Sequence, residues 1–384
     1  MQPSRREFMA TSAWGLAALG TGRLLEQSSQ DAGSVLPTRG KSSGKPLPTN
    51  PPNTFGRYRT PYRFGLGGVA IGNGFAETSD AQAEAALEAA WEAGVRYYDT
   101  SPWYGLGVGE HRFGQFLHNH KGEDYVLSTK VGRLLKPTTD TPKNAGFVNP
   151  GPFSYQYDYS AEGTRRSIED SLQRLGVEKI DIVFIHDLSP DNKDMGERWV
   201  DYFNAALQGA MPELSKMRKE GLIRGWGFGI NTPDAALKSL DMADPDVCLM
   251  AAQYSILNHR DALDKTFPAL QGRGVSVVVG SPFNAGYLTG RERYNYAGTI
   301  PPEAPVKRRR MTELAKEHGI DLRTAALQFC AAPDVVCAVI PGARNAEQVR
   351  ANAASMQVVI PDEFWSALKR EGMIAANAPV PKAT

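Results

Sequence analysis

Four residues of different chemistry stand at or just after short strand-like runs of the chain. Asp99 ends the run 95–99, and Tyr104 lies five residues further on, in a turn that contains proline and glycine. Lys130 follows the run 125–129, and His186 follows the run 180–185. If these strands lie side by side with their ends together, the four side chains form one site.

The four side chains together predict a proton-transfer device. A tyrosine phenol has an ordinary pKa near 10, and a neighbouring ammonium group lowers that pKa. Lys130 is the candidate ammonium, and Asp99 would keep it charged and oriented. Tyr104 can then exchange a proton with a substrate oxygen, while His186 donates a hydrogen bond to the same oxygen.

Each of these residues also has a purely structural interpretation. Asp99 can cap a strand end, Tyr104 can be a turn aromatic, Lys130 a surface charge and His186 a packed core side chain. Their joint occurrence at successive strand ends favours function. No nucleophile stands beside a base and no metal-ligand set is evident. Glycoside hydrolysis would need two facing acids. Asp99 and Asp187 could be proposed, but a carboxylate paired with lysine is a poor proton donor.

The elements that must position these residues alternate regularly from residue 62 onward. The expected strands are 63–71, 95–99, 125–129, 180–185, 223–228, 247–253, 275–279 and 335–340. The expected helices are 79–92, 109–117, 160–175, 203–220, 232–242, 261–271, 311–318 with 322–331, and 345–355. Eight strand–helix units predict a (β/α)8 TIM barrel, in which chemistry lies at the C-terminal ends of the strands. The alternative, a doubly wound open sheet, would want a G-x-G-x-x-G turn that the glycines near residues 65–74 do not form.

One segment breaks the alternation. Residues 134–159 are too long for an ordinary connection, and such loops are usually functional or disordered. The segment carries a series of aromatic residues: Phe147, Phe153, Tyr155, Tyr157 and Tyr159. We expect an irregular but ordered loop that covers a site.

The composition limits the classes of partner. The chain has 384 residues, with 41% hydrophobic and 22% charged residues, as in a globular protein with a sizeable core. Its formal charge of +1 gives no reason to expect nucleic acid or an acidic membrane surface as a partner. Three cysteines are too few for a disulfide framework. We expect no stable membrane insertion of the mature part, and a monomer or small homo-oligomer.

The N-terminus resembles a twin-arginine export signal. Arg5 and Arg6 are followed by Phe8 and by the mildly apolar stretch 10–20. We therefore expect a signal segment at 1–30, a flexible linker rich in Ser, Pro and Gly at 31–60, and the barrel at 61–384. The implied location is the periplasm, or the cytoplasm if the signal is not used. The alternative interpretation of the first residues is a disordered basic tail.

Four motifs resemble the aldo-keto reductase superfamily. They are D-T-S-P-W-Y-G at 99–105, G-V-G-E-H-R-F-G-Q-F-L at 107–117, S-T-K-V-G-R at 128–133 and I-D-I-V-F-I-H-D at 180–187. The resemblance covers about residues 62–355. It implies that Asp99, Tyr104, Lys130 and His186 are the catalytic residues. It also implies a nicotinamide cofactor that lies across the barrel mouth without a separate dinucleotide-binding domain.

The same resemblance implies the cofactor contacts, with NADP or NAD as the cofactor. Asn231 and Gln253 match the carboxamide ligands. The residues that match the pyrophosphate loop are Ser281, Pro282 and Asn284, and those that match the adenosine-phosphate segment are Gly342, Arg344, Gln348 and Asn352. A glycine-bearing turn before a helix N-terminus favours anions, and Arg344 can pair with a 2′-phosphate or stack on adenine. The alternative is a capped surface helix. Ile230 and Gly280 depart from the common pattern, which has serine and tyrosine there.

Within the superfamily, the chain is most similar to the group of D-threo-aldose 1-dehydrogenases and pyridoxal 4-dehydrogenases. The similarity rests on W-Y-G-x-G-x-G-E at 103–110, K-V-G-R-L-L at 130–135 and G-S-P-F-N-A-G-Y-L at 280–288. It implies oxidation of an aldose at C1 to a lactone, or reduction of the corresponding carbonyl, with Trp103 as a substrate wall. The alternatives are a pyridoxal or general aldehyde/ketone reductase, and a catalytically weak cofactor-binding sensor or regulatory subunit.

Overall fold

The computed structural model describes residues 40, 43–51, 57–142, 146–296 and 299–382. The predicted signal segment and much of the predicted linker lie outside these residues. Eight parallel strands form one sheet. In sheet order they are β1 (Leu66–Gly67), β2 (Tyr97–Asp99), β3 (Val126–Val131), β6 (Ile182–His186), β7 (Gly225–Ile230), β8 (Val247–Ala251), β9 (Ser276–Gly280) and β10 (Val336–Ile340).

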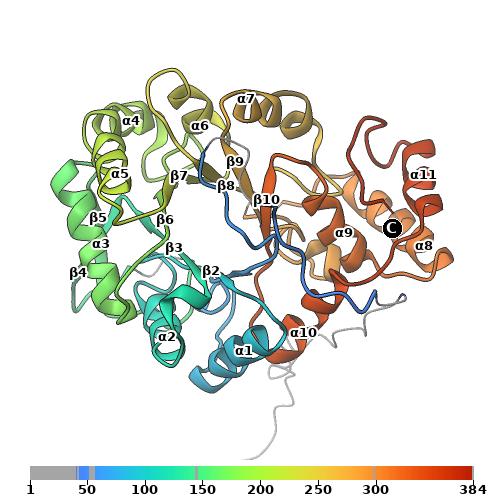
Figure 1. Ribbon diagram of the computed structural model, residues 1–384, viewed down its shortest axis with the longest axis horizontal. Coiled ribbons are helices and arrows are strands. Elements are labelled where there is room, and N and C mark those ends of the chain that lie inside the picture. Colours follow the sequence, from blue (N-terminus) through green and yellow to red (C-terminus); the bar gives the residue numbers. More distant parts are fainter. Residues whose placement is uncertain (1–39, 41–42, 52–56, 143–145, 297–298, 383–384) are drawn as a thin grey trace, which may run out of the picture. The chain divides into compact units, whose positions relative to one another are not determined.

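The sheet closes on itself. Parallel bridges join Phe64 to Val339 and Gly67 to Gly342, so the first and last strands are neighbours. Figure 1 shows the strands around a common centre with the helices outside them. The predicted (β/α)8 barrel is therefore confirmed.

The helices follow the expected order with two differences. They are α1 (Asp80–Glu92), α2 (Val108–Leu117), α3 (Ala161–Leu175), α4 (Trp199–Gln208), α5 (Ala210–Lys219), α6 (Asp234–Ser239), α7 (Phe267–Gly272), α8 (Ala304–Glu317), α9 (Leu322–Ala331), α10 (Ala346–Ser355) and α11 (Asp362–Arg370). A π-helical turn, Ala262–Thr266, precedes α7. Helix α11 was not expected. The single helix expected at 203–220 is also wrong, because α4 and α5 meet at Gly209, where a Cβ would lie 2.4 Å from the Tyr159 carbonyl oxygen.

Local signals explain where two of these helices begin and end. Ser79 and Gln82 form a capping box at the start of α1, which is where the sequence predicts the helix to begin. Helix α3 begins with Ser160, whose hydroxyl accepts from the Gly163 N–H, and ends at Gly176 in the left-handed region. These ends need only a few neighbouring residues, which is why the sequence predicts them well.

The long insertion is partly regular, where an irregular loop was expected. It contains an antiparallel hairpin of β4 (Arg133–Pro137) and β5 (Phe153–Tyr157), with Leu135 opposite Tyr155. Aromatic residues alternate with others along β5, as a half-buried strand requires. The described residues between the two strands belong to no helix or strand, as expected. The two strands were missed because the hairpin partner lies sixteen or more residues away along the chain for every pair.

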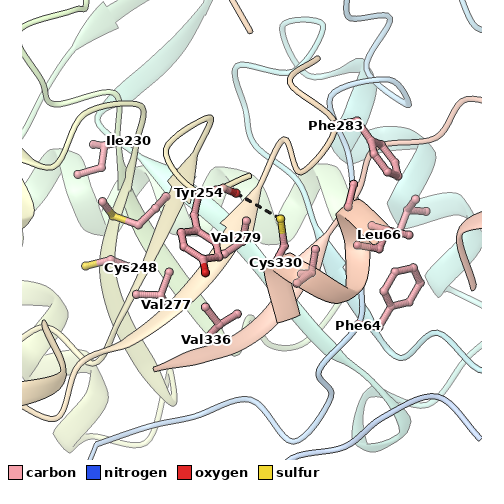
Figure 2. Packing of buried hydrophobic residues seen from close by; sticks show 14 of the residues in the cluster. Phe64, Leu66, Ile230, Cys248, Tyr254, Val277, Val279, Phe283, Cys330 and Val336 are labelled. Carbon is pink, nitrogen blue, oxygen red and sulfur yellow. Dashed lines mark hydrogen bonds between the residues drawn. The ribbon is translucent and has the colours of Figure 1, made fainter. Parts of the chain in front are cut away.

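The apolar core has two layers. The larger one fills the space between strands and helices, and Figure 2 shows part of it, with Cys248, Val277 and Val336 near Tyr254. There the Cys330 thiol donates to the Tyr254 carbonyl oxygen at 3.3 Å. A smaller cluster fills the barrel interior, and Tyr58 and Tyr62 pack against it. Residues 43–51 and 57–60, part of the predicted linker, are described here, and Asn50 donates to the Cys337 carbonyl oxygen at 2.8 Å.

Within the described residues, no helix combines the length and the apolar character that crossing a membrane requires.

Candidate functional site

The sheet order brings the predicted proton-transfer residues to one end of the barrel. Strand β3 lies between β2 and β6, with Asp99 paired to Ser128 and Lys130 paired to Phe184. The C-terminal ends of all three strands point the same way because the strands are parallel. Asp99, Lys130 and His186 therefore lie at the same mouth.

Asp99 and Lys130 form a buried ion pair. The ammonium Nζ lies 2.9 and 2.8 Å from the two carboxylate oxygens, and it donates to the Thr100 carbonyl oxygen at 2.7 Å. The side chains are 2% and 1% exposed. Burial raises the pKa of Asp99 and lowers the pKa of Lys130, while the opposite charge of the partner acts against both shifts.

Tyr104 is held above this pair by two close backbone approaches. A Cβ at Gly72 would lie 2.7 Å from the Tyr104 Cβ and backbone carbon, and Gly105 adopts a φ of +67° that glycine tolerates. The phenol side chain is buried, and Lys130 Nζ lies 4.6 Å from its ring centroid. The ammonium donates its hydrogen bonds to Asp99 and Thr100.

A lowered pKa was expected for Tyr104 because of the nearby lysine, and this expectation is wrong. Burial raises the pKa of Tyr104 well above its ordinary value, and the charge of Asp99 acts in the same direction. Arg133 acts weakly against this shift. At neutral pH the Tyr104 phenol is therefore protonated and is a proton donor.

His186 is oriented by Ser101. The two meet through the histidine Nδ1 and the serine Oγ at 3.1 Å, and the same Oγ accepts from the Trp103 N–H at 3.1 Å. Among the described residues no other acceptor for the Ser101 proton is present, so the hydroxyl donates to Nδ1 and leaves the proton of the neutral ring on Nε2. Burial, followed by Arg133 and Lys130, lowers the pKa of His186 and keeps the ring neutral.

The hairpin supplies an aromatic wall beside Tyr104. Trp103 lies 5.6 Å from Phe147 and 4.7 Å from Tyr155 between ring centroids. The Arg133 guanidinium lies 4.5 Å from the Trp103 ring centroid and pairs with Asp187 at 2.9 Å. Trp103 thus lies where the sequence predicts a substrate wall.

Two residues at this mouth, Ser101 and Arg133, were not singled out in the sequence, and Asp187 was considered there only as an acid for glycoside hydrolysis. Each stands inside a quoted motif, within three residues of Trp103, Lys130 or His186. Closeness in sequence to a candidate residue was the available signal. It was weak because neighbours on a strand point to opposite faces.

The two predicted carboxamide ligands lie at the ends of neighbouring strands. Asn231 follows β7, and its Nδ2 donates to Asp191 at 3.3 Å. Gln253 follows β8, and its Nε2 is buried without a hydrogen-bond partner within the described part of the chain. Gln253 therefore presents an unsatisfied donor, and Asn231 is already engaged.

The segment after β9 has the backbone of a tight loop. Ser281 and Asn284 adopt φ values of 55° and 50°, and the Ser281 Oγ accepts from the Ala285 N–H at 3.2 Å. Asn284 is fully buried, with Nδ2 donating to Asn295 and Oδ1 without a partner in the described residues. Pro282 lies between them and is buried. Ahead of this loop, a Cβ at Gly280 would lie 3.2 Å from a Leu249 methyl carbon, so the strand is tightly packed there.

The residues predicted to hold the adenosine phosphate divide into two groups. Gly342 is exposed at the barrel closure, and Arg344 is half-buried with Nη2 donating to the Gly74 carbonyl oxygen at 3.3 Å. Gln348 turns back onto the helix start, where its Oε1 accepts from the Arg344 N–H at 3.0 Å. Asn352 is buried, with 5% exposed. The structure brings Gly342, Arg344 and Gln348 together at the α10 N-terminus, and places Asn352 one turn deeper.

Comparison with known proteins decides the family. The Aldo/keto reductase family profile matches residues 63–371, which include the whole barrel mouth described above. The chain belongs to the aldo/keto reductase family. Membership makes it an oxidoreductase that uses a nicotinamide cofactor, NADP or NAD.

Two curated relatives are similar to this aldo/keto reductase over most of its length. A pyridoxal 4-dehydrogenase of Microbacterium luteolum is 36% identical over 327 residues, covering 81% of this chain and 94% of the relative. A D-threo-aldose 1-dehydrogenase of a Pseudomonas species is 34% identical over 320 residues, covering 81% and 94%. Among solved structures, an aldo-keto reductase from Bacillus halodurans has a TM-score of 0.62 at 24% identity, covering 90% of this chain and 99% of that chain. The structural likeness supports the barrel fold.

The mouth of this aldo/keto reductase fits a nicotinamide cofactor. Gln253 offers a buried donor and Asn284 a buried acceptor, both unsatisfied within the described residues. Buried polar groups without partners are rare in proteins, so each calls for a ligand or a water. The exposed backbone at Gly342 beside the start of α10 offers N–H groups of the kind that bind phosphate.

Proposed function

We propose that this aldo/keto reductase oxidises a cyclic aldose at C1 to a lactone, or reduces the corresponding carbonyl, with NADP or NAD. The observation that carries the proposal is the buried Tyr104 phenol, which lies over the Lys130–Asp99 pair and 5.8 Å from the His186 ring between centroids. The relatives named as an aldose and a pyridoxal dehydrogenase support the same chemistry.

The residues of this chain have distinct tasks in that reaction. His186 donates its Nε2 proton as a hydrogen bond to the substrate oxygen and fixes its position. Tyr104 takes the hydroxyl proton of that oxygen in oxidation and returns it in reduction. Lys130 and Asp99 hold a compensated charge beneath the phenol ring.

The chemistry that a bound nicotinamide supplies is hydride exchange with C1 of the substrate. Gln253 and Asn231 would hold its carboxamide, and the loop with Ser281, Pro282 and Asn284 would hold the pyrophosphate. Gly342, Arg344, Gln348 and Asn352 would hold the adenosine end. Arg344 supplies a positive charge for a 2′-phosphate, which favours NADP among the two cofactors.

The aromatic wall suits a sugar ring. The faces of pyranose rings carry C–H groups, and Trp103, with Phe147 and Tyr155 around it, offers flat apolar surface next to Tyr104. The substrate is thus a small carbohydrate held with C1 at the tyrosine.

A second candidate is a pyridoxal or general aldehyde reductase. The raised pKa of Tyr104 favours it, because a protonated phenol is already the donor that carbonyl reduction needs. A sensor or regulatory subunit with little turnover is disfavoured by the four residues being present and in contact at one mouth.

The test is an assay of the purified chain with NADP⁺ and NAD⁺ against a panel of aldoses, with the lactone identified chemically. The same preparation is assayed in reverse with pyridoxal and simple aldehydes. We expect oxidation of at least one aldose with a higher kcat/KM than any aldehyde reduction. Reduction of pyridoxal or aldehydes without aldose oxidation would replace the first candidate with the second, and no turnover in either direction would favour the sensor.

We further propose that the chain is exported to the periplasm through its paired arginines, Arg5 and Arg6, which lie outside the described residues. The twin-arginine route carries folded proteins, so the cofactor can bind before export. Fractionation of cells that express the full chain tests this, with Arg5→Lys and Arg6→Lys combined as the comparison. If the unaltered chain stays in the cytoplasm to the same extent as the double variant, the export proposal is wrong.

A further inference from the structure

Asp187, the residue after His186, lies directly beside the reacting position. His186 uses Nδ1 for Ser101, so Nε2 is the ring nitrogen that meets the substrate oxygen. The Asp187 Oδ1 lies 3.6 Å from that same Nε2. The charge of Asp187 also acts on Tyr104, where it raises the phenol pKa. An acceptor therefore lies 3.6 Å from one of the two groups that hold the substrate oxygen, and its charge acts on the other.

The backbone of Asp187 is held firmly in an unusual conformation. Its φ of 45° lies in the left-handed region, which aspartate tolerates better than most residues. Its N–H donates to the Gly229 carbonyl oxygen at 2.9 Å, and its carbonyl accepts from Asn192 Nδ2 at 2.9 Å. Such conformations persist where the surroundings enforce them, often at functional sites.

Arg133 occupies one oxygen of this carboxylate and leaves the other. Its Nη1 donates to Asp187 Oδ2 at 2.9 Å. No hydrogen bond to Oδ1 occurs within the described residues, and the Asp187 side chain is 21% exposed. Oδ1 is thus a carboxylate acceptor on a partly exposed side chain at the mouth.

Arg133 is itself fixed in place. It is 5% exposed, and its guanidinium lies 4.5, 5.1 and 5.8 Å from the ring centroids of Trp103, Tyr157 and Tyr155. Although burial acts against the charged form, the Asp187 carboxylate holds the pKa of Arg133 above its ordinary value. The pair is therefore held in place within the aromatic wall that contains Trp103.

We propose that Asp187 binds the hydroxyl group on the carbon next to the reacting carbon, and so selects neutral hydroxylated substrates. This deepens the proposed function and rests on it for the assignment of the reacting oxygen to His186 and Tyr104. A substrate with its reacting oxygen on His186 Nε2 places the neighbouring hydroxyl a few ångström away, toward Oδ1. Substrates without that hydroxyl leave Oδ1 without a hydrogen-bond donor, and substrates with a carboxylate or phosphate at that position are repelled.

The experiment compares reduction of glycolaldehyde, which has the neighbouring hydroxyl, with reduction of acetaldehyde, which lacks it. We expect the wild-type holoenzyme to prefer glycolaldehyde by at least about tenfold in kcat/KM. Asp187→Ala should lower kcat/KM for glycolaldehyde by about 10- to 100-fold and for acetaldehyde by less than about threefold. Asp187→Asn, which keeps the size and the backbone tolerance, should retain part of the preference because its carbonyl is a neutral acceptor.

Asp201→Asn is the matched control. Asp201 is an exposed acid on α4, in the same connection between β6 and β7, and its loss should leave both substrates unchanged. Thermal unfolding of all variants tests whether they fold. If Asp187→Ala does not fold, Asp187→Asn is compared with the wild type instead. Equal losses on both substrates would overturn the proposal, because Asp187 would then act only through His186 or through folding. A wild-type enzyme without preference would also overturn it.

The reducing direction separates the two proposals. Suppose that the wild type prefers glycolaldehyde, that Asp187→Ala loses this preference, and that neither oxidises an aldose. This result would refute the aldose reaction and support the hydroxyl-binding role of Asp187. An enzyme that oxidises an aldose and its 2-deoxy analogue equally well, in wild type and variants alike, retains the reaction and refutes the hydroxyl site.

Discussion

Two buried aspartates at opposite ends of the barrel have different partners. Asp99, at the end of β2, accepts from the Ser128 hydroxyl at 2.7 Å and from Lys130. Asp181, just before β6, accepts from the Leu127 N–H at 2.9 Å and pairs with Arg224 at 3.2 Å. Both side chains are 2% exposed, and burial raises the pKa of both.

The difference shows that burial of a carboxylate does not by itself mark a functional site. Asp181 joins neighbouring strands, because its side chain holds the β3 backbone and its carbonyl accepts from the Arg224 N–H at 2.8 Å. Asp99 holds a lysine whose ammonium faces a tyrosine ring at the mouth. Barrels generally place stability at the N-terminal ends of strands and chemistry at the C-terminal ends.

The largest effect is expected at Tyr104, whose ring lies over the ammonium of the Asp99–Lys130 pair. Tyr104→Phe keeps the ring over Lys130 and removes the exchangeable proton. We expect kcat to fall by about 10²- to 10⁴-fold, because a positioned acid or base contributes about that much. Steady-state kinetics and nucleotide titration measure this, and nucleotide affinity should stay within about twofold. A variant that keeps most of its turnover would refute the role of Tyr104.

The difference between the two aspartates is tested by replacing each of them in turn with asparagine. Asp99→Asn leaves Lys130 buried beside a neutral amide, so we expect about 100-fold lower kcat and about 3–5 kcal/mol less stability. Asp181→Asn should cost about 1–3 kcal/mol, since a charged hydrogen bond is lost, with kcat nearly unchanged. Kinetics and denaturant unfolding of the two variants decide. Equal losses of activity would mean that the two ends do not differ in function.

The pH dependence of the two reaction directions tests the protonation state of Tyr104. Oxidation needs Tyr104 without its proton, and burial together with Asp99 raises the pKa of Tyr104. The rate of oxidation should therefore rise with pH, by up to about tenfold per unit, and still be rising near about pH 9. Reduction needs the protonated phenol and should be flat over the same range. Profiles of kcat/KM in both directions measure this, and an oxidation rate that levels off below about pH 8 would contradict it.

The smallest effect is expected at Ser101. Ser101→Ala removes the hydroxyl that donates to His186 Nδ1, so the ring is no longer held with its proton on Nε2. We expect kcat to fall by about three- to tenfold with KM and unfolding temperature little changed, since one hydrogen bond contributes about 0.5–1.5 kcal/mol. An unchanged kcat would show that the ring keeps its orientation without the serine.

Much of the barrel was predictable because its signals are local. The β-branched run before Gly280 reads as a buried strand, and β9 ends at that glycine. The cap at Ser79 also needs only nearby residues. The β4–β5 hairpin and the break at Gly209 were missed, because both depend on contacts with distant segments.

The candidate residues show the same division. Asp99, Tyr104, Lys130 and His186 were recognisable from residue type and place at strand ends, and the mouth brings them together. Their electrostatics were not recognisable. Burial, with the charge of Asp99 acting in the same direction, raises the phenol pKa where a fall was expected.

The sequence by itself determined the order of the eight barrel strands and most of the helices, the family motifs and the four candidate residues Asp99, Tyr104, Lys130 and His186. These follow from periodicity, caps and residue chemistry along short stretches of chain. Only the tertiary structure decided which side chains form hydrogen bonds and ion pairs with one another. The Arg133–Asp187 pair and the Ser101–His186 contact join residues 54 and 85 positions apart. Burial, which governs the pKa of Tyr104 and His186, likewise arises only when the barrel closes.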